Sequence, residues 1–409
     1  MIRLAWRNLW RNRRRTLITA FSIGFGVLLA VTFTGTGDYA YTNMIDAGAS
    51  MGYGHVTIEP VGYNRTPTLD KRIGDSAALR ADALSQPDVR DAIVRILGQG
   101  MFATASNSIG GSFLGVDPAS ETPAWSLLLR SLVRGNMLRD RDGSGVIIGS
   151  KMADHLNLDL GKKLVYTTTD ASGEIVSEAA RVRGIFHTGI NEVDNAFVML
   201  PIDRLRHVLG YRKGEATMVA IMLRDQRRTR RVRDALQHRI GTSVAVLDWR
   251  QTQPDLAGII NIDRSSNYIS QLLIGLLIAA GILNTLLMSV LERTREFGIM
   301  MAVGMSPGQL FRLIMTESFW LACIGLLMGT VITAPWYWYL ATYGIDFSGS
   351  IGHDYSAGGV LIDPVFHIRL FAESIVAILA GLFTLAILAG LYPAWRAGRI
   401  PPVESLKAL

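Results

Sequence analysis

Residues 265–291 read SSNYISQLLIGLLIAAGILNTLLMSVL and contain no Asp, Glu, Lys, Arg or His. A helix rises about 1.5 Å per residue, so some 20 residues cross the roughly 30 Å hydrocarbon layer of a bilayer. Three more charge-free runs of this length cover residues 16–37, 318–344 and 374–395. A buried core helix is a weak alternative at such lengths. The sequence therefore predicts four transmembrane helices, arranged as one plus three.

The composition agrees with a membrane protein. Of the 409 residues, 49% are hydrophobic and only 18% are charged, which is too apolar for two or three soluble domains. The one cysteine, Cys323, excludes an intrachain disulfide, a Cys-rich zinc site and an iron–sulfur cluster. The histidines are scattered, so no metal site is predicted.

Residues 1–15, ahead of the first run, form an amphipathic segment with six arginines. A secretory signal also begins with basic residues, but its apolar stretch is about 7 to 15 residues long and ends at a cleavage site. The run 16–37 is longer, so we expect a retained anchor. No cysteine lies near the N-terminus, and therefore no lipid-attachment site is predicted.

Basic residues predict the topology. Residues 1–15, the loop 292–317 and the tail 396–409 together carry twelve bases and four acids, whereas residues 38–264 carry 28 bases and 26 acids. The loop 345–373 carries one base and four acids. The positive-inside rule places both termini and the loop 292–317 in the cytoplasm, and the other two segments outside. The basic balance is thus a topology signal, and no nucleic-acid partner is predicted.

The outer segment 38–264 is long enough for one or two folded modules. Helical patterns cover residues 76–84, 150–156, 203–209 and 229–240, and strand patterns cover residues 55–59, 145–148, 163–168, 180–186, 196–200 and 217–223. Residues 170–173 predict a hairpin turn between two of these strands. The fold class is therefore a membrane protein, α + α/β, with a large mixed α/β domain inserted between transmembrane helices 1 and 2.

The densest basic cluster of this outer segment contains five arginines between Arg227 and Arg233. A nucleic-acid site is one interpretation. A solvated helix face is favoured, because the domain lies outside and no aromatic residues interleave the arginines. The sequence assigns the cluster no function.

No catalytic signature is found. The glycines of Gly145–Gly149 are separated by three residues and Lys151 does not follow directly, so the spacing of a phosphate-binding loop is not met. No nucleophile elbow or zinc motif occurs, and the acid pair Glu192 and Asp194 is better explained as turn and cap residues. We expect that the chain is no enzyme and binds no cofactor, and that any ATP dependence comes from a partner.

Small residues four apart allow close packing of membrane helices. Such pairs are Gly325 with Gly329, Ala377 with Gly381, and Ala386 with Gly390. Asn284 lies within the second span. An amide without a partner is costly in hydrocarbon, so Asn284 is expected to face another helix.

The loop between the second and third spans is the most informative stretch, and residues 291–312 read LERTREFGIMMAVGMSPGQLFR. Ser306 suits a helix N-cap, Pro307 the first helical position and Gln309 the partner in a capping box. Phe297, Ile299, Met300, Met301 and Val303 predict an exposed apolar surface ahead of that helix, of the kind that docks into a partner's groove.

This loop resembles the signature of the FtsX-like, or MacB-type (type VII), ABC transporter permease family: Glu-Arg-x-x-Glu, an apolar residue, Gly-Ile, then Ala-Val-Gly-Met and a polar turn. The tail 393–406, PAWRAGRIPPVESL, resembles the family's ending. In the outer domain, residues 114–118, 145–149 and 182–189, together with Glu192 and Asp194, are most similar to the lipoprotein-releasing LolC/LolE branch. The resemblance covers nearly the whole chain.

The resemblance implies an FtsX-like permease domain over about residues 268–402, following a MacB-like periplasmic core domain, in the bacterial inner membrane. It implies a second permease subunit, identical or different, and ABC ATPase subunits that bind ATP and Mg. The residues expected to couple the chain to the ATPase are Arg293, Glu296, Phe297, Gly298, Met301, Val303, Gly304 and Met305.

In the LolC/LolE branch the work is extraction of a lipoprotein from the membrane lipid and its transfer to a periplasmic chaperone. Two alternatives remain open: MacB-like export of a periplasmic substrate, and FtsX-like regulation of a cell-wall hydrolase. A fused ATPase, as in MacB, is not found in this sequence, and the outer domain of FtsX is typically smaller.

Overall fold

The computed structural model describes residues 2–141, 143–346, 356–357, 360–361 and 365–399. Two compact units can be distinguished. The first contains Met1–Ala40, Ile262–Asp346 and Val365–Leu409, and the second contains Tyr41–Asn261 and Phe347–Pro364. Residues 400–409 of the expected tail, Met1, and much of the expected loop 345–373 lie outside the described residues.

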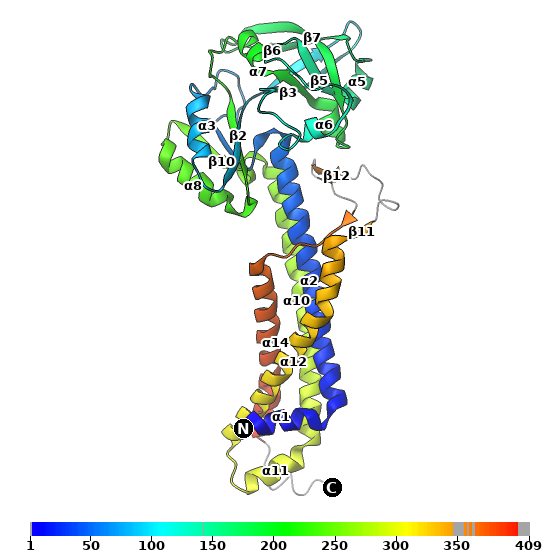
Figure 1. The fold of residues 1–409 in the computed structure, drawn as a ribbon. Helices are drawn as coiled ribbons and strands as arrows, with labels where there is room; N and C mark the ends of the chain where they lie inside the picture. Colours follow the sequence, from blue (N-terminus) through cyan, green and yellow to red (C-terminus); the bar gives the residue numbers. More distant parts are fainter. Residues whose placement is uncertain (1, 142, 347–355, 358–359, 362–364, 400–409) are drawn as a thin grey trace. The chain divides into compact units, whose positions relative to one another are not determined.

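The first unit is helical (Figure 1). Its elements are α1 (Ile2–Arg11), α2 (Arg13–Gly48), α10 (Pro254–Glu292), α11 (Thr294–Ala302), α12 (Pro307–Thr342) and α14 (Ala372–Gly398), with a short strand pair β11 (Ile345–Asp346) and β14 (Val365–Phe366). Four of these helices, α2, α10, α12 and α14, are long and apolar enough to cross a membrane. This finding confirms the predicted one-plus-three arrangement of apolar helices.

Glycines allow α2 and α12 to approach each other closely. A Cβ atom added to Gly329 would lie 2.8 Å from the Cα of Gly24, and one added to Gly325 would lie 2.7 Å from the Cβ of Ile23. Further along α12, Ser318 lies against Gly390 of α14. Three of the glycines singled out from the sequence therefore lie where two helix backbones meet.

Asn284 and Gly381 are exposed, and each lines an open hollow between helices, where a tight helix contact was expected. The buried residues of α10 recur every four positions, at Ile278, Ile282 and Leu286, so that Asn284 faces the opposite side and is exposed. A Cβ atom at Gly381 would meet no atom within 4 Å. Sequence spacing indicated these two positions as candidates, but in the structure neither lies at a tight contact between helix backbones.

The second unit is built on a ten-stranded sheet. Its strands are β1 (Val56–Pro60), β2 (Val89–Ala103), β3 (Ser108–Val116), β4 (Leu132–Gly135), β5 (Gly145–Gly149), β6 (Lys163–Thr169), β7 (Ile175–Phe186), β8 (Phe197–Pro201), β9 (Met218–Leu223) and β10 (Val244–Asp248). The pairings β2-β3-β8-β5-β7-β6 return to β2 and form a closed circuit. The first half of β2 instead continues into β9, β1 and β10.

Helices cover this sheet. α3 (Ser76–Leu84) and α8 (Thr229–Ile240) pack near β2, β9 and β10, while α5 (Ser150–His155), α6 (Asn191–Ala196) and α7 (Ile202–Val208) pack on the closed circuit. Shorter helical turns are α4 (Leu127–Arg130), α9 (Trp249–Thr252), the 3₁₀ turn Gln226–Arg228 and the π-helical turn Ala49–Tyr53. A two-residue pair, β12 (Ser356–Ala357) and β13 (Val360–Leu361), completes the described elements. The predicted mixed α/β domain is confirmed.

The predicted helices and strands of this domain are found with shifts of one residue at their ends, except that β7 begins five residues earlier than the predicted strand 180–186. The turn at residues 170–173 joins β6 and β7. Four strands were missed: β2, β3, β4 and β10. β3 reads SIGGSFLGV, and its glycines have a low strand propensity, so the sequence does not predict a strand here. Its pairing with β2 and β8 stabilises the strand in the sheet. On α8, Val232 and Leu236 are buried, Arg230 and Arg231 are exposed, and the half-buried Arg233 pairs with Asp234, as on a solvated helix face.

A buried ion pair connects the end of the first long helix to the sheet. Arg95 of β2 and Glu121 are both fully buried, and Arg95 donates to the two carboxylate oxygens from Nε (3.0 Å) and Nη2 (2.6 Å). Its Nη1 donates to the carbonyl of Gly52 at 2.6 Å, in the π-helical turn after α2. Beside this turn, Tyr41 and Ile45 of α2 pack with Trp249 and Leu256. The helix end is therefore fixed to the domain by both polar and apolar contacts.

Glu59 of β1 predicts a pH dependence of stability. Burial raises the pKa of this carboxyl to about 7, although the Asn64 N–H and the Lys71 ammonium favour its ionised form. Because the folded-state pKa lies above the unfolded value near 4.5, the stabilising contribution is full below pH 4.5 and is lost as the pH rises through 7. We therefore expect the free energy of unfolding to fall by on the order of 2–4 kcal/mol between pH 5 and 8, measured by hydrogen exchange of β1. Glu59→Gln carries no titrating group at this position and should abolish this fall. The exposed control Glu174→Gln should leave this pH dependence intact.

Candidate functional site

The site predicted in the loop 292–317 is centred on α11, which follows α10 after Arg293 alone. A turn at residues 303–305 leads from α11 to α12, and Gly304 adopts a φ of 108° that side-chain-bearing residues rarely take. Ser306 caps α12: its hydroxyl accepts from the Gln309 N–H at 3.3 Å, and the Gln309 side chain accepts from the Ser306 N–H at 2.9 Å. The predicted capping box, with Pro307 at the start of the helix, is confirmed.

One face of α11 is buried. Phe297 is 1% exposed, Gly298 is also buried, and both belong to the side that meets the beginning of α12 and the end of α14. The apolar cluster around Phe297 contains Ala5, Val290, Leu310, Leu313, Ile314, Ala394 and Ala397, with Met300, Met301 and Met305 packed against it. The expectation that Phe297 belongs to an exposed surface is therefore wrong, because its ring anchors α11 to this unit.

The opposite face of α11 and the following turn are open. Val303 is 84% exposed and Ile299 is 48% exposed, while Met301 is half-buried. Exposed aliphatic side chains in a short, well-anchored loop form a surface suited to docking. We name Ile299, Met301 and Val303 the apolar knob.

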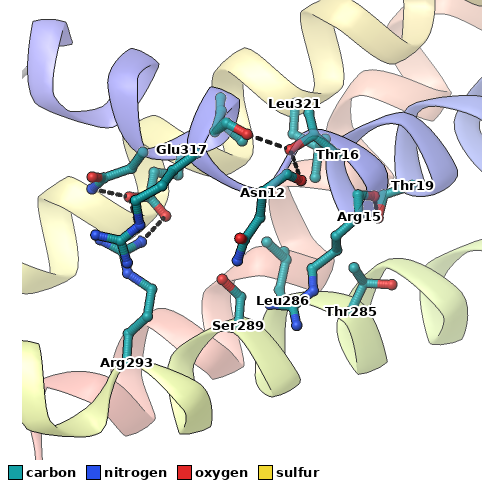
Figure 2. Close-up of a pocket in the computed structure, with 13 residues that line it drawn as sticks. Asn12, Arg15, Thr16, Thr19, Thr285, Leu286, Ser289, Arg293, Glu317 and Leu321 are labelled. Carbon is teal, nitrogen blue, oxygen red and sulfur yellow. Dashed lines mark hydrogen bonds and ion pairs between the residues drawn. The ribbon is translucent and has the colours of Figure 1, made fainter.

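A polar network holds α11 from behind. Arg293 is 6% exposed, and it donates to Glu317 of α12 at 3.2 Å and to Glu296 of α11 at 3.0 Å. Asn8 of α1 also donates to Glu317, at 2.7 Å, and Arg11 of α1 donates to Glu296 at 2.6 Å. Figure 2 shows Arg293 reaching from below toward Glu317. Four helices, α1, α10, α11 and α12, are thus joined around one buried arginine at the end of α10.

The ion pairs that Glu296 makes with Arg293 and Arg11 depend on pH. Burial opposes the charge of Glu296, but hydrogen bonds from Arg293 and Arg11 prevail and hold the pKa of this carboxyl below its usual value. Because the folded-state pKa is lowered, the contribution of the pair is present above the unfolded pKa and is lost as the pH falls through the folded value. The pairs that Glu296 makes with Arg293 and Arg11 are therefore present at neutral pH.

Replacing Arg293 tests whether the network positions α11. In Arg293→Met the carboxylate of Glu317 remains buried without its cation, and breaking such a pair costs about 3–5 kcal/mol. We expect faster hydrogen exchange in residues 294–302, although no exposed atom of the apolar knob has changed. The double variant Arg293→Met with Glu317→Leu removes the unpaired charge and should restore most of the protection. Unchanged exchange in the single variant would contradict a positioning role.

The structure brings together all the loop residues predicted from the sequence but divides their roles. Arg293, Phe297 and Gly298 are buried, Glu296 is partly exposed and Gly304 shapes the turn. Met301, Met305 and Val303 range from half-buried to exposed. Sequence reasoning missed Asn8, Arg11 and Glu317 as partners of this site. A carboxylate at the edge of an apolar run, as Glu317 is, was the available signal, because such a charge needs a partner.

The described residues of the second unit contain one arrangement that resembles a hydrolytic triad in composition. His187 Nδ1 lies 2.9 Å from the hydroxyl of Ser150 and 2.9 Å from Asp194 Oδ2. In a triad the serine and the carboxylate contact different ring nitrogens, whereas here both contact the same one. Buried Asp194 instead accepts from the Thr188 N–H and hydroxyl and from the Gly189 N–H, as a turn-capping residue does. Among the described residues no group of three or more metal-ligating side chains occurs.

Two family sequence models match this chain. The MacB-like periplasmic core domain matches residues 16–239, and the FtsX-like permease C-terminal domain matches residues 268–402. The second match contains α11, the apolar knob and Glu317.

Relatives of known name are similar over much of the chain. The transmembrane protein LolC of the lipoprotein-releasing system of Xylella fastidiosa is 24% identical over 311 residues, which are 72% of this chain and 72% of LolC. The pyoverdine export ATP-binding/permease protein PvdT of Pseudomonas aeruginosa is 24% identical over 425 residues, covering 99% of this chain and 58% of PvdT. An uncharacterized ABC transporter permease of Methanocaldococcus jannaschii is 23% identical and covers 100% of this chain and 97% of that protein.

Two solved structures were also found to be similar. The periplasmic region of MacB from Actinobacillus actinomycetemcomitans is 12% identical, with a TM-score of 0.35, and covers 49% of this chain and 90% of that structure. The extracellular domain of the ABC-type transporter YknZ from Gram-positive bacteria is 16% identical, with a TM-score of 0.32, and covers 47% of this chain and 100% of that structure.

Proposed function

This chain belongs to the ABC transporter permease family that joins a MacB-like periplasmic core domain to an FtsX-like permease domain, and we propose that it transmits the motion of a partner ATPase to its own periplasmic domain. The four apolar helices and the permease relatives indicate an inner-membrane protein. We place both termini and the loop 292–317 in the cytoplasm, in agreement with the distribution of basic residues.

The observation that carries the proposal is the apolar knob on a helix that is anchored from behind. Val303 and Ile299 present apolar surface, while Phe297 and the Arg293 network fix α11 to α1, α12 and α14. A surface that is exposed but held rigidly can pass a displacement to the helices behind it. ATP and Mg belong in this proposal to the partner ATPase, which docks at the knob, and this chain itself performs no catalysis.

On the other side of the membrane, the displacement would reach the periplasmic domain through helices that contribute residues to both units. α2 and α10 are such helices. The Arg95 contacts to Gly52 and Glu121 attach the turn that follows α2 to the sheet. This attachment supports the proposal, because a displacement of the end of α2 would then also displace the sheet. A second permease subunit, identical or different, completes the transporter in this proposal.

For the cargo we propose a lipoprotein, extracted from the inner membrane and passed to a periplasmic chaperone. The similarity to LolC supports this cargo, whereas the equally strong similarity to PvdT favours export of a periplasmic substrate as the alternative. FtsX-like regulation of a cell-wall hydrolase is a further alternative. Lipoprotein extraction requires a sheltered path, because each CH₂ group moved out of the bilayer costs about 0.8 kcal/mol. Several acyl chains then cost tens of kcal/mol in total, which makes coupling to ATP reasonable.

Photocrosslinking can identify the cargo. A photoreactive amino acid is placed at Phe33 on α2 or at Leu272 on α10, which are 43% and 63% exposed and lie toward the expected outer ends of these helices. Leu388 on α14, 59% exposed, is the control position. We expect acylated proteins to be captured at the first two positions and not at the third, when membranes of the source cell are irradiated without ATP.

The captured material distinguishes the alternatives. Capture of unlipidated cargo at Phe33 and Leu272 would contradict the lipoprotein cargo and favour export of a periplasmic substrate. Capture of a cell-wall hydrolase would favour the regulatory role. Equal capture of acylated proteins at Leu388 would show lipid-phase collision and would contradict a binding path on α2 and α10.

A further inference from the structure

A cavity of about 700 Å³ opens between the beginning of α2 and the final turns of α10, within the first unit. Its lining residues are Arg11, Asn12, Arg13, Arg14, Arg15, Ile18, Asn284, Thr285, Met288 and Glu292. This volume lies within the range of roughly 300–1,000 Å³ that small-molecule sites occupy. Of the residues that line this cavity, Arg11 alone also belongs to the network that holds α11, through its pair with Glu296.

The cavity is strongly basic. Four arginines line it against the one carboxylate of Glu292, which pairs with Arg15. Arg11 pairs with Glu296, but Arg13 and Arg14 are exposed and make no ion pair with any residue in the described part of the chain. Guanidinium groups bind phosphate in a two-pronged geometry. The unbalanced charge therefore calls for an anion, and a phosphate fits the donor set.

Two buried donors near this cavity lack partners. Nη1 of Arg15 and Nη2 of Arg293 are buried without a hydrogen bond, and both arginines line a smaller cavity of about 40 Å³ beside Asn12, Ser289 and Glu317. The two cavities share Arg11, Asn12, Arg15 and Thr285, so they adjoin. Figure 2 shows Arg15 pointing from α2 toward the helix that carries Leu286 and Ser289. A buried donor without a partner is costly, and a bound phosphate or its water would satisfy Arg15.

The polarity of the cavity changes along the helices. Ile18 and Met288 are 57% and 52% exposed, and they line the part of the cavity that faces into the span. Asn284 lies about 12 Å along the helix axis from Glu292 and is exposed there, where an amide without a partner is unfavourable. The arginines at one end, followed by the aliphatic side chains of Ile18 and Met288 about one helical turn further along, match the headgroup and the adjoining acyl carbons of a phospholipid, while Thr285 and Asn284 lie deeper along α10.

We propose that this cavity binds the phosphate headgroup of an anionic phospholipid from the cytoplasmic leaflet. The proposal rests on the membrane orientation stated under Proposed function but not on the ATPase or the cargo. Clusters of basic residues directly beside a membrane helix are attracted to anionic lipid. A second copy of this chain is a poorer occupant, because it would bring the same four arginines toward each other.

The test measures lipid binding to the full chain. Detergent-purified protein is depleted of lipid and titrated with dioleoylphosphatidylglycerol, with dioleoylphosphatidylcholine or with inorganic phosphate, and bound molecules are counted by native mass spectrometry. We expect a saturable phosphatidylglycerol site and weaker binding of phosphatidylcholine. The double variant Arg13→Gln with Arg14→Gln should bind phosphatidylglycerol roughly 30-fold more weakly. Arg13→Lys with Arg14→Lys keeps the charge and should retain most of the affinity.

The matched control is Arg3→Gln with Arg7→Gln, which removes two exposed arginines of α1 outside the cavity. Loss of affinity equal to that of the Arg13 and Arg14 variant would show general attraction to the basic segment and would overturn the site. Displacement of bound lipid by millimolar inorganic phosphate would overturn the lipid proposal and would identify free phosphate as the ligand of the cavity.

Disulfide formation between two chains carrying Asn284→Cys, in a Cys323→Ser background, would assign the face to a second copy. We expect no such disulfide in native membranes. Neither the ATPase nor the cargo takes part in these measurements. Failure of the lipid site can therefore be distinguished from failure of the proposed function.

Discussion

Val303→Asp should release the ATPase from this permease. Val303 is 84% exposed on the turn after α11, so the substitution leaves the buried contacts of Phe297 untouched while it places a charge in the apolar knob. If the knob enters an apolar groove, the carboxylate must be desolvated there, and central interface residues of this kind contribute about 2 kcal/mol or more. We expect the affinity for the ATPase subunit to fall at least about 30-fold. The measurement is the amount of ATP-binding subunit that co-purifies with the tagged chain.

The conservative control is Val303→Leu, which keeps the surface apolar and should retain the ATPase. Hydrogen exchange of residues 294–302 should be the same in both variants, because neither changes the anchored face of α11. Undiminished co-purification with Val303→Asp would refute the docking surface.

Arg95→Met should destabilise the MacB-like domain more than any surface substitution. Glu121 would remain fully buried without its cation, and breaking such a pair costs about 3–5 kcal/mol. The carbonyl of Gly52 would also lose its donor. We expect protection of residues 89–103 from hydrogen exchange to fall at least roughly 100-fold, while the protection of α12 stays the same.

The double variant Arg95→Met with Glu121→Leu separates stability from transmission. It removes both charges and should recover most of the protection of β2, because a well-packed apolar pair can replace a buried ion pair. It does not restore the hydrogen bond to Gly52. We therefore expect a stable domain whose cargo release per ATP hydrolysed is lower than in the unchanged protein. Full release in the double variant would remove Gly52 from the transmission path.

The sequence predicted the membrane helices and the capping box because both depend on local chemistry. A run of more than 20 apolar residues has few stable arrangements other than a membrane helix, and Ser306, Pro307 and Gln309 lie within a single helical turn. β3 was missed since its glycines weaken the local pattern, while pairing in the sheet supplies the stability. For the same reason the Arg95 pair, 26 residues apart in sequence, left no local signal.

The sequence by itself determined that the loop 292–317 carries an apolar segment beside basic residues, next to four apolar helices. Only the tertiary structure decided which of these apolar side chains are available to a partner. The phase of α11 against α12 and α14 turns Phe297 inward and leaves Val303 outside. The same phase brings Arg293 to Glu317 across 24 residues, because a buried charge is stable only where the fold supplies its partner.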